Sequence, residues 1–207
     1  MTVRSMFAIS LFALAAGATD AASQARSTTA GFHLGAALNG SSVKVDVEDE
    51  ETGLESEREN GAGISLTAGY NFTPQFGLLI NLTGANVSSD GGDFGLGHAD
   101  LAGRFSIANP ASALVPYLEL GISSIALVDE DEESGDDVTI SGTGFTGAAG
   151  LNYFFSPKLA LDANVRFTMG ELDTLKIGGE SVTTDDGIDA TTARINIGIS
   201  WFPGGGR

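Results

Sequence analysis

The side chains with the clearest chemical potential in this sequence are two histidines and the polar residues close to them. His98 and Asp100 are two positions apart, which places both on one face of a β-strand. A His–carboxylate pair near a serine, such as Ser88 or Ser89, is the arrangement of a nucleophilic hydrolase. The simpler interpretation is a hydrogen-bonded pair near the end of a strand. We favour it because this spacing often arises by chance. His33 is too far along the predicted topology to share a metal with His98.

Acidic residues dominate the charge, and most of them lie in four segments. The net charge is −17, from 27 Asp and Glu against 10 Lys and Arg. Too few basic residues are present for nucleic-acid binding, and the absence of cysteine excludes disulfides and thiolate metal sites. No segment matches a twelve-residue calcium loop, so we expect diffuse attraction of Ca²⁺ or Mg²⁺ rather than a defined metal site. Residues 45–60, 88–95, 129–142 and 171–189 hold eight, two, seven and six acids, respectively.

A second group of charges interrupts runs that are otherwise apolar. Its three acids and three arginines all share the polar parity of their runs, so they would face one side of a sheet and balance one another. A turn symmetric between Ala111 and Ser112 would place Arg104 opposite Glu119 as an inward ion pair. We interpret the group as a structural plug; a proton or ion relay is the alternative. The six residues are Asp100, Arg104, Glu119, Asp162, Arg166 and Arg194.

Alternation of apolar and polar residues predicts the elements that carry these charges. In residues 190–202 the apolar side chains share one parity and the polar ones the other, which is the period of a β-strand. Such a run is long enough to cross a bilayer, which takes about 9 to 11 residues. We therefore expect apolar side chains to face lipid and polar ones to face a lumen. Eight such strands are predicted, at 31–44, 64–72, 76–87, 96–107, 116–128, 145–155, 159–169 and 190–202.

The connections between these runs alternate long and short, as in antiparallel membrane barrels. A short turn centred on Pro74 would pair Tyr70 with Leu78 and Ala68 with Ile80, which puts their apolar side chains on one face. Aromatic residues concentrate near the short turns and are interpreted as an interfacial girdle. The predicted girdle comprises Phe32, Phe72, Phe76, Tyr117, Tyr153, Phe155 and Trp201.

The N-terminus has the features of an export signal. Arg4 precedes the short apolar run 7–18, and small residues follow it. Cleavage after Ala18 or after Ala25 fits equally well, and a buried N-terminal helix is the alternative. The predicted organisation is a signal peptide over 1–25 and one β-barrel domain over 26–207.

Taken together, these features resemble the small eight-stranded outer-membrane barrels of Gram-negative bacteria, the OmpA transmembrane-domain, OmpX and opacity-like group. The last strand carries the resemblance through Ile195, Ile197, Ile199 and Trp201, whereas Phe202 has the opposite parity and 203–207 extend past the usual end. The resemblance implies an all-β, antiparallel, up-and-down transmembrane barrel in the outer membrane. It also implies recognition of the last strand by the barrel insertion machinery, contact with outer-membrane lipid and lipopolysaccharide, and no cofactor.

The resulting functional hypothesis is a non-enzymatic barrel with a side-chain-filled lumen. It would act in envelope integrity or in surface interaction through its acidic loops. Three alternatives remain: an outer-leaflet lipid-modifying enzyme that uses His98, a small pore or hydrophobic-ligand conduit, and a soluble lipocalin-like carrier.

Overall fold

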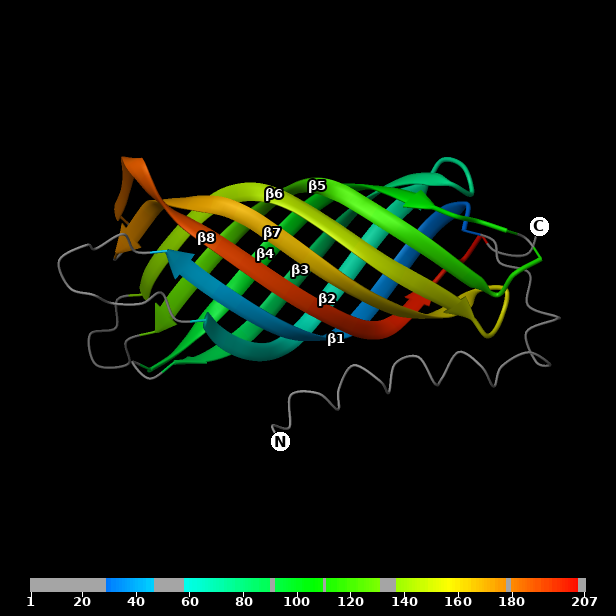
Figure 1. Ribbon diagram of the computed structural model, residues 1–207, viewed down its shortest axis with the longest axis horizontal. Coiled ribbons are helices and arrows are strands. Elements are labelled where there is room, and N and C mark those ends of the chain that lie inside the picture. The colour runs from blue at the N-terminus through cyan, green and yellow to red at the C-terminus, as the bar shows by residue number, and fades with distance from the viewer. Residues whose placement is uncertain are drawn as a thin grey trace, which may run out of the picture.

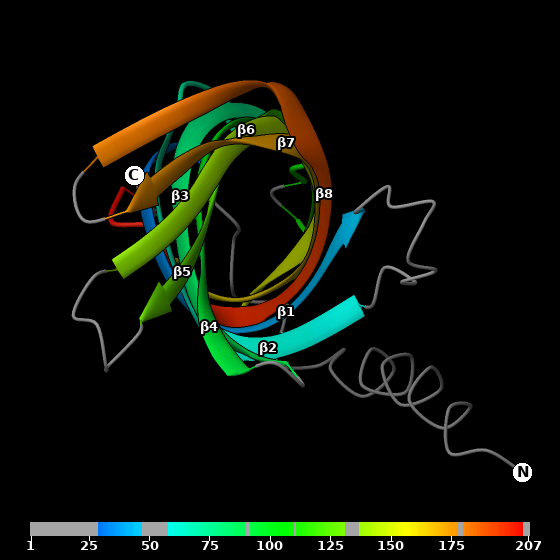
Figure 2. The ribbon, with the colours of Figure 1, turned by 90° about the vertical axis from the view of Figure 1, so that its left-hand side faces the viewer.

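The described chain forms a closed β-barrel. The computed structural model describes residues 29–46, 58–89, 92–109, 111–130, 137–177 and 180–204, and the predicted signal peptide lies outside them. Each strand pairs antiparallel with the next, and β8 pairs with β1 to close the ring, as Figure 2 shows from one end. The strands are β1 (Gly31–Asp46), β2 (Arg58–Asn71), β3 (Phe76–Ser89), β4 (Gly92–Ser106), β5 (Leu114–Glu130), β6 (Asp137–Phe154), β7 (Leu159–Ile177) and β8 (Glu180–Trp201).

The barrel has two different ends, and its strands run obliquely between them (Figure 1). β1 begins at Gly31 and β8 finishes at Trp201 at one end, here called the terminal end. Asp46 pairs with Asp189 at the opposite end, here called the acidic end. In the part of the chain that the structure describes, no helix has the length and hydropathy needed to cross a membrane. The predicted eight-stranded antiparallel barrel is confirmed.

The predicted register at the short connections is also confirmed. Tyr70 pairs with Leu78 and Ala68 pairs with Ile80 across β2 and β3. The turn between these strands is held by the hydroxyl of Thr73, which accepts hydrogen bonds from the backbone N–H groups of Gln75 and Phe76 at 3.2 and 3.0 Å. With a short turn, only one register places the apolar side chains of both strands on the same face of the sheet. The sequence pattern alone therefore determines the pairing.

The prediction that 129–142 and 171–189 are loops is wrong for most of their length. β6 already begins at Asp137, β7 continues to Ile177 and β8 begins at Glu180. Backbone hydrogen bonding continues past the apolar part of the wall, although the register between β7 and β8 shifts between Leu172 and Thr174. Beyond the apolar wall both faces of a hairpin meet water, so apolar–polar alternation is no longer required and the sequence loses its strand signal.

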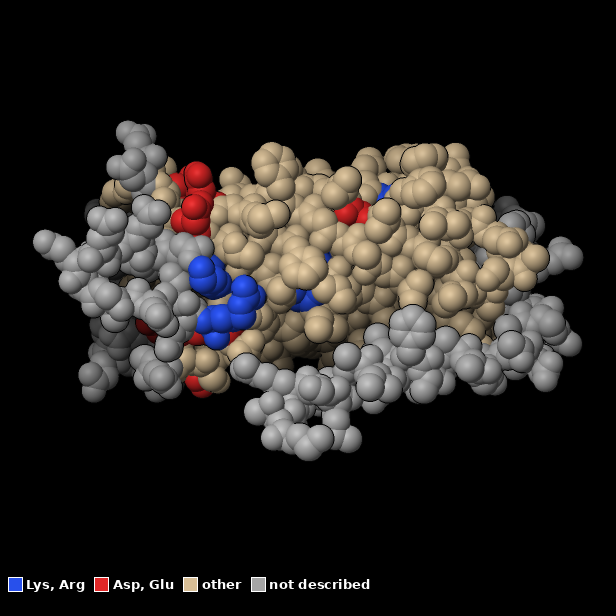
Figure 3. Space-filling view, in the orientation of Figure 1, with Lys and Arg blue, Asp and Glu red and all other residues tan. Residues whose placement is uncertain are grey.

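The outer wall of the barrel is apolar, as predicted. Leu120 and Phe145 are each 77% exposed, and Ile195, Ile197 and Leu161 also point outward. Figure 3 shows a broad band along the barrel that is mostly uncharged, with a few charged atoms visible within it and most of the visible acidic and basic side chains near the acidic end. An apolar exterior of this extent marks a surface that faces lipid.

The interior departs from the simple rule that polar residues face inward, because an apolar layer occupies each end. The charged side chains of the lumen lie between these two layers, whereas the buried His33 lies at the terminal end, stacked on Phe202. The acidic-end layer consists of Val43, Val87, Leu96, Ile125, Leu172 and Ala190. The terminal-end layer consists of Ala113, Val115, Phe154, Ala160 and Phe202.

Candidate functional site

Between the two apolar layers, the lumen holds a network of buried charges. Its acids come from adjacent strands, Asp100 on β4 and Glu119 on β5, and its arginines come from β4, β7 and β8. All five side chains are at most 5% exposed. Asp100, Arg104, Glu119, Arg166 and Arg194 are referred to below as the charge network.

Glu119 lies at the centre of one half of the charge network. Its Oε1 accepts a hydrogen bond from Arg104 Nε at 2.6 Å, and Arg104 Nη2 lies at the same distance. Its Oε2 accepts a hydrogen bond from Arg166 Nη2. The Arg104–Glu119 pairing predicted from the β4–β5 register is present, whereas the contact with Arg166 on β7 crosses the lumen. One carboxylate therefore ties three strands together.

Asp100 is the second anionic centre. Arg194 donates to both of its oxygens, from Nη1 to Oδ2 at 2.9 Å and from Nη2 to Oδ1 at 3.1 Å. Arg166 Nη1 lies 3.6 Å from Oδ2, so Arg166 links the two anionic centres. Arg194 Nη2 also donates to Thr168 Oγ1 at 2.8 Å. A paired arginine fork is the strong form of this interaction, and removing one partner would leave an uncompensated buried charge.

Asp162, the sixth predicted inward charge, is buried but forms no ion pair with the other described residues. It accepts hydrogen bonds from the hydroxyl of Tyr117 at 2.9 Å and from Asn164 Nδ2 at 3.0 Å. The amide chain continues from Asn164 through Asn196 to Asn39, at 2.9 and 2.8 Å. Neutral donors rather than arginine therefore satisfy this carboxylate.

The assignment of Tyr117 to an outward aromatic girdle is wrong. Its ring is 2% exposed and lies in the lumen, where the guanidinium carbon of Arg104 is 4.1 Å from the ring centroid. Tyr117 shares the strand parity of Glu119 rather than that of Leu118, so the pleat turns it inward. There the ring meets a cation on its face and a carboxylate at its hydroxyl, which an outward position in lipid would not provide.

The other predicted girdle residues lie on the outer side of the terminal end. Tyr153 is partly buried against the terminal-end layer. Neighbouring rings contact one another there, with Phe76 and Phe105 at 5.1 Å and Phe32 and Tyr70 at 4.8 Å between centroids. The remaining exposed members are Phe32, Phe72, Phe76, Phe155 and Trp201.

Neither histidine is placed for hydrolysis. Both are buried; His98 Nε2 lies 3.0 Å from the Thr192 hydroxyl, and the nearby Asp100 carboxylate is taken by Arg194. His33 instead stacks on Phe202, with ring centroids 5.5 Å apart. Across the described ranges, no three His, Cys, Asp or Glu side chains are arranged to hold a metal ion. The hydroxyl beside His98 is therefore that of Thr192, and both side chains are buried among the ion pairs of the lumen.

The apolar layers were missed at the sequence level, although the signal was present. Ile125 has the same strand parity as the inward Ser123, and Phe202 has the parity opposite to the outward Trp201. An apolar residue on the polar parity near a strand end therefore indicates a layer that closes the lumen.

A cavity of about 20 Å³ lies beside Arg104, Arg166 and Asp162. It has room for about one water, which needs about 10–15 Å³.

Comparison with known proteins identifies the fold family. The family described as outer membrane protein beta-barrel domain matches residues 10–201. The chain belongs to this family. None of the curated protein sequences matches the chain.

Two solved outer-membrane proteins show how far the likeness to this barrel extends. Neisserial surface protein A is 18% identical over 83% of this chain and 97% of its own, with a TM-score of 0.59. OprG from Pseudomonas aeruginosa is 15% identical over 86% of this chain and 98% of its own, with a TM-score of 0.60. At these identities the likeness concerns the fold alone.

Family membership gives the barrel its environment. It is an outer-membrane barrel, so the apolar wall faces hydrocarbon and the lumen is its protected interior. Barrels of this class keep short turns in the periplasm and longer extensions outside. By that rule we expect the terminal end, with its short turns, to face the periplasm and the acidic end to face outward.

Proposed function

We propose that this outer-membrane barrel is non-enzymatic and acts at the cell surface, in envelope integrity or in surface interaction, through its acidic end. The observation that carries the proposal is the lumen filled with paired side chains. The charge network is internally paired, and an apolar layer lies above it and another below it. What remains available to a partner is the outer end.

The acidic end supplies the chemistry of the proposed interaction. Among the described acids, Asp93 and Asp129 are exposed there, and the sequence places many more in 45–60 and 129–142. Acids in such numbers attract divalent cations and cationic surfaces at range, and salt weakens the attraction. The proposed partners are therefore outer-membrane lipid, lipopolysaccharide bridged by divalent cations, and cationic groups on other surfaces. The barrel insertion machinery is the proposed partner during assembly.

Two alternatives receive less support from the geometry. A pore needs a continuous aqueous path, and eight strands enclose an interior only wide enough for side chains. A lipid-modifying enzyme using His98 would need a nucleophile that lies beside the imidazole and is open to lipid. The hydroxyl beside His98 is that of Thr192, at 3.0 Å, and both side chains are buried in the lumen.

The proposal is tested in a deletion strain that is complemented either with the wild-type gene or with a variant gene. In the variant, the acids of 45–60 and 129–142 are changed to amides. We expect the deletion to raise sensitivity to detergent plus chelator, and the wild type alone to restore resistance. A variant that restores resistance fully would refute the role of the acids. Conductance steps from the purified barrel in a planar bilayer would favour a pore, and a changed lipid A profile in the deletion strain would favour an enzyme.

A further inference from the structure

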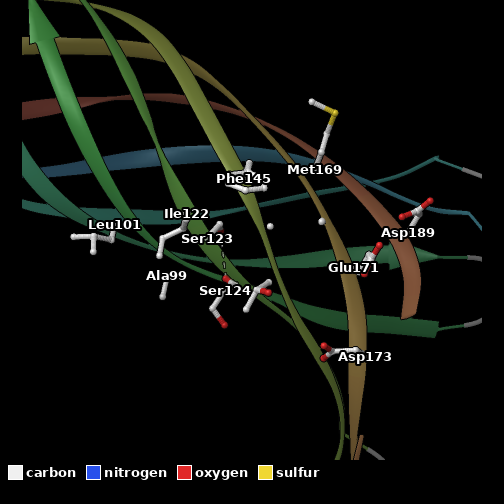
Figure 4. Close-up of a pocket in the computed structure, with 13 residues that line it drawn as sticks. Ala99, Leu101, Ile122, Ser123, Ser124, Phe145, Met169, Glu171, Asp173 and Asp189 are labelled. Atoms are coloured by element: carbon white, nitrogen blue, oxygen red, sulfur yellow. Dashed lines mark hydrogen bonds between the residues drawn. The ribbon is translucent and has the colours of Figure 1, made fainter. Parts of the chain in front are cut away.

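The small cavity in the lumen lies directly beside buried charges. It differs in this from the groove of about 730 Å³ on the outer wall, which outward side chains such as Phe145 and Met169 line (Figure 4). The lumen cavity of about 20 Å³ is bordered by two arginines of the charge network, by Asp162 and by small or polar side chains. A small polar molecule would find both hydrogen-bond donors and acceptors there.

Arg104 has a buried donor that no described residue accepts. It directs Nε and Nη2 to Oε1 of Glu119, so Nη1 lies on the other side of the guanidinium group. Nη1 is shielded from solvent and has no hydrogen-bond partner among the described residues. Arg166 also borders the cavity, and its Nε likewise has none within the described ranges. A buried charged donor without an acceptor is costly, so a further acceptor at this place would be stabilising.

Asp162 offers acceptor capacity at the same cavity. Its side chain is 8% exposed, and an ionised carboxylate has about four lone-pair sites. Oδ1 accepts hydrogen bonds from Tyr117 and Asn164 at 2.9 and 3.0 Å. The hydrogen bond described for Oδ2 is a long one, from the Ser200 hydroxyl at 3.4 Å. Oδ2 can therefore accept a further, shorter hydrogen bond.

Tyr117 holds Arg104 and Asp162 near each other without an ion pair between them. The guanidinium carbon of Arg104 is 4.1 Å from the centre of the Tyr117 ring, and the hydroxyl of the same ring donates to Asp162. The charge network has three arginines and two acids, so it contains one cation more than it has anions. One molecule between the two groups would let Asp162 act as the third counter-charge.

We infer that the cavity binds one water molecule, which accepts a hydrogen bond from Arg104 Nη1 and donates one to Oδ2 of Asp162. The volume suits about one water. Water both donates and accepts, whereas Asp162 would repel an anion and the arginines would repel a cation. A water bridge of this kind is nearly as favourable in enthalpy as a direct hydrogen bond. Asp162 thereby joins the charge network, and β4 and β7 gain a further link across the lumen.

Gly35 on β1 keeps space open for the water. It borders the cavity, and a Cβ atom at this position would lie 3.2 Å from Ser200 Oγ and 3.4 Å from Thr67 Cβ. The Ser200 hydroxyl can rotate away, because it is the end of a side chain. A methyl group on residue 35 would therefore take up part of the cavity and displace the water.

A high-resolution crystal structure of the folded barrel tests the inference directly. We expect a density peak within about 3.2 Å of both Arg104 Nη1 and an Asp162 oxygen. The peak should have no anomalous signal in crystals grown with bromide as the halide, and it should be absent from Gly35→Ala. An empty cavity in the wild type would overturn the inference, and an anomalous peak would overturn it in favour of an anion.

Urea titration in lipid vesicles tests the role of the water independently. Asp162→Asn should lower the unfolding midpoint, and in the Gly35→Ala background this loss should be smaller by about a third, because the water is one of three short donors to the carboxylate. Gly84→Ala is the matched control, since a methyl group there meets no atom within 4 Å, and it should leave the loss unchanged. Equal losses in the Gly35→Ala and Gly84→Ala backgrounds would overturn the inference. Unboiled gel migration checks that each variant is folded.

Discussion

Arg194 on β8 and Asp100 on β4 meet across the lumen in a two-pronged ion pair, at 2.9 and 3.1 Å. The two strands are separated by three others on either side of the ring, so the pair braces opposite walls. Both side chains are fully shielded from water. A buried pair of this kind need not add net stability, but it makes each partner dependent on the other.

Removal of one partner should therefore cost more than removal of both. Asp100→Asn leaves the guanidinium of Arg194 without its counter-charge, and we expect a loss of about 3–5 kcal/mol in the free energy of unfolding. The double variant Asp100→Leu/Arg194→Met should recover part of that loss. Urea titration in lipid vesicles, followed through the fluorescence of Trp201, the one tryptophan, measures both. Additive losses would show that the two side chains act independently.

Glu119→Gln should be more damaging than Asp162→Asn. Glu119 is the partner of both Arg104 and Arg166, so its loss leaves two buried cations short of a counter-charge, at a cost of about 3–5 kcal/mol. Asp162 is held by neutral donors, and its neutralisation should cost about 1–3 kcal/mol. The same urea titration ranks them, and the reverse order would contradict the assigned partners.

Tyr117→Phe tests the inward position of this ring. The change removes the hydroxyl donor to Asp162 and keeps the ring beside Arg104. We expect a loss of about 1.5–3 kcal/mol, the range for a hydrogen bond to a charged group. Tyr153→Phe, on the outward face, is the matched control and should change stability little. Equal effects of the two substitutions would indicate that Tyr117 points outward, as part of the aromatic girdle.

A charged substitution on the lipid-facing wall should destabilise the barrel. Leu120 is 77% exposed on the wall, and Leu120→Arg should cost about 2–4 kcal/mol if it lies near the bilayer midplane. Asp129→Arg, at the acidic end, should be tolerated. The fraction that folds into vesicles, read from unboiled gel migration, compares them. Equal folding of both variants would show that the Leu120 position does not face hydrocarbon.

Orientation can be checked with single cysteines, because the chain has none of its own. Arg58 lies at the acidic end, and Lys158 lies in the turn before β7. A membrane-impermeant maleimide should label Arg58→Cys on intact cells, and Lys158→Cys only after the outer membrane is opened. Labelling of Lys158→Cys alone on intact cells would reverse the orientation.

The sequence by itself determined the strands, the lipid-facing wall and the local pairings. Alternation with a period of two fixes which side chains share a face, and a short turn allows one register that aligns the apolar sides, as with Tyr70 and Leu78. The same logic predicted Arg104 opposite Glu119. These results depend only on interactions between strands that are neighbours in the chain.

Only the tertiary structure decided which residues meet across the lumen. The contacts of Arg194 with Asp100 and of Arg166 with Glu119 join strands that are not neighbours in the sheet, and the curvature and closure of the barrel, not strand parity, bring them together. Strand parity also predicts that Tyr117 points inward. The side chains that hold its ring and hydroxyl, Arg104 on β4 and Asp162 on β7, are seen only in the structure. The full length of β6, β7 and β8 also became visible only in the structure, because hairpins with water on both faces form the same backbone ladder without an apolar pattern.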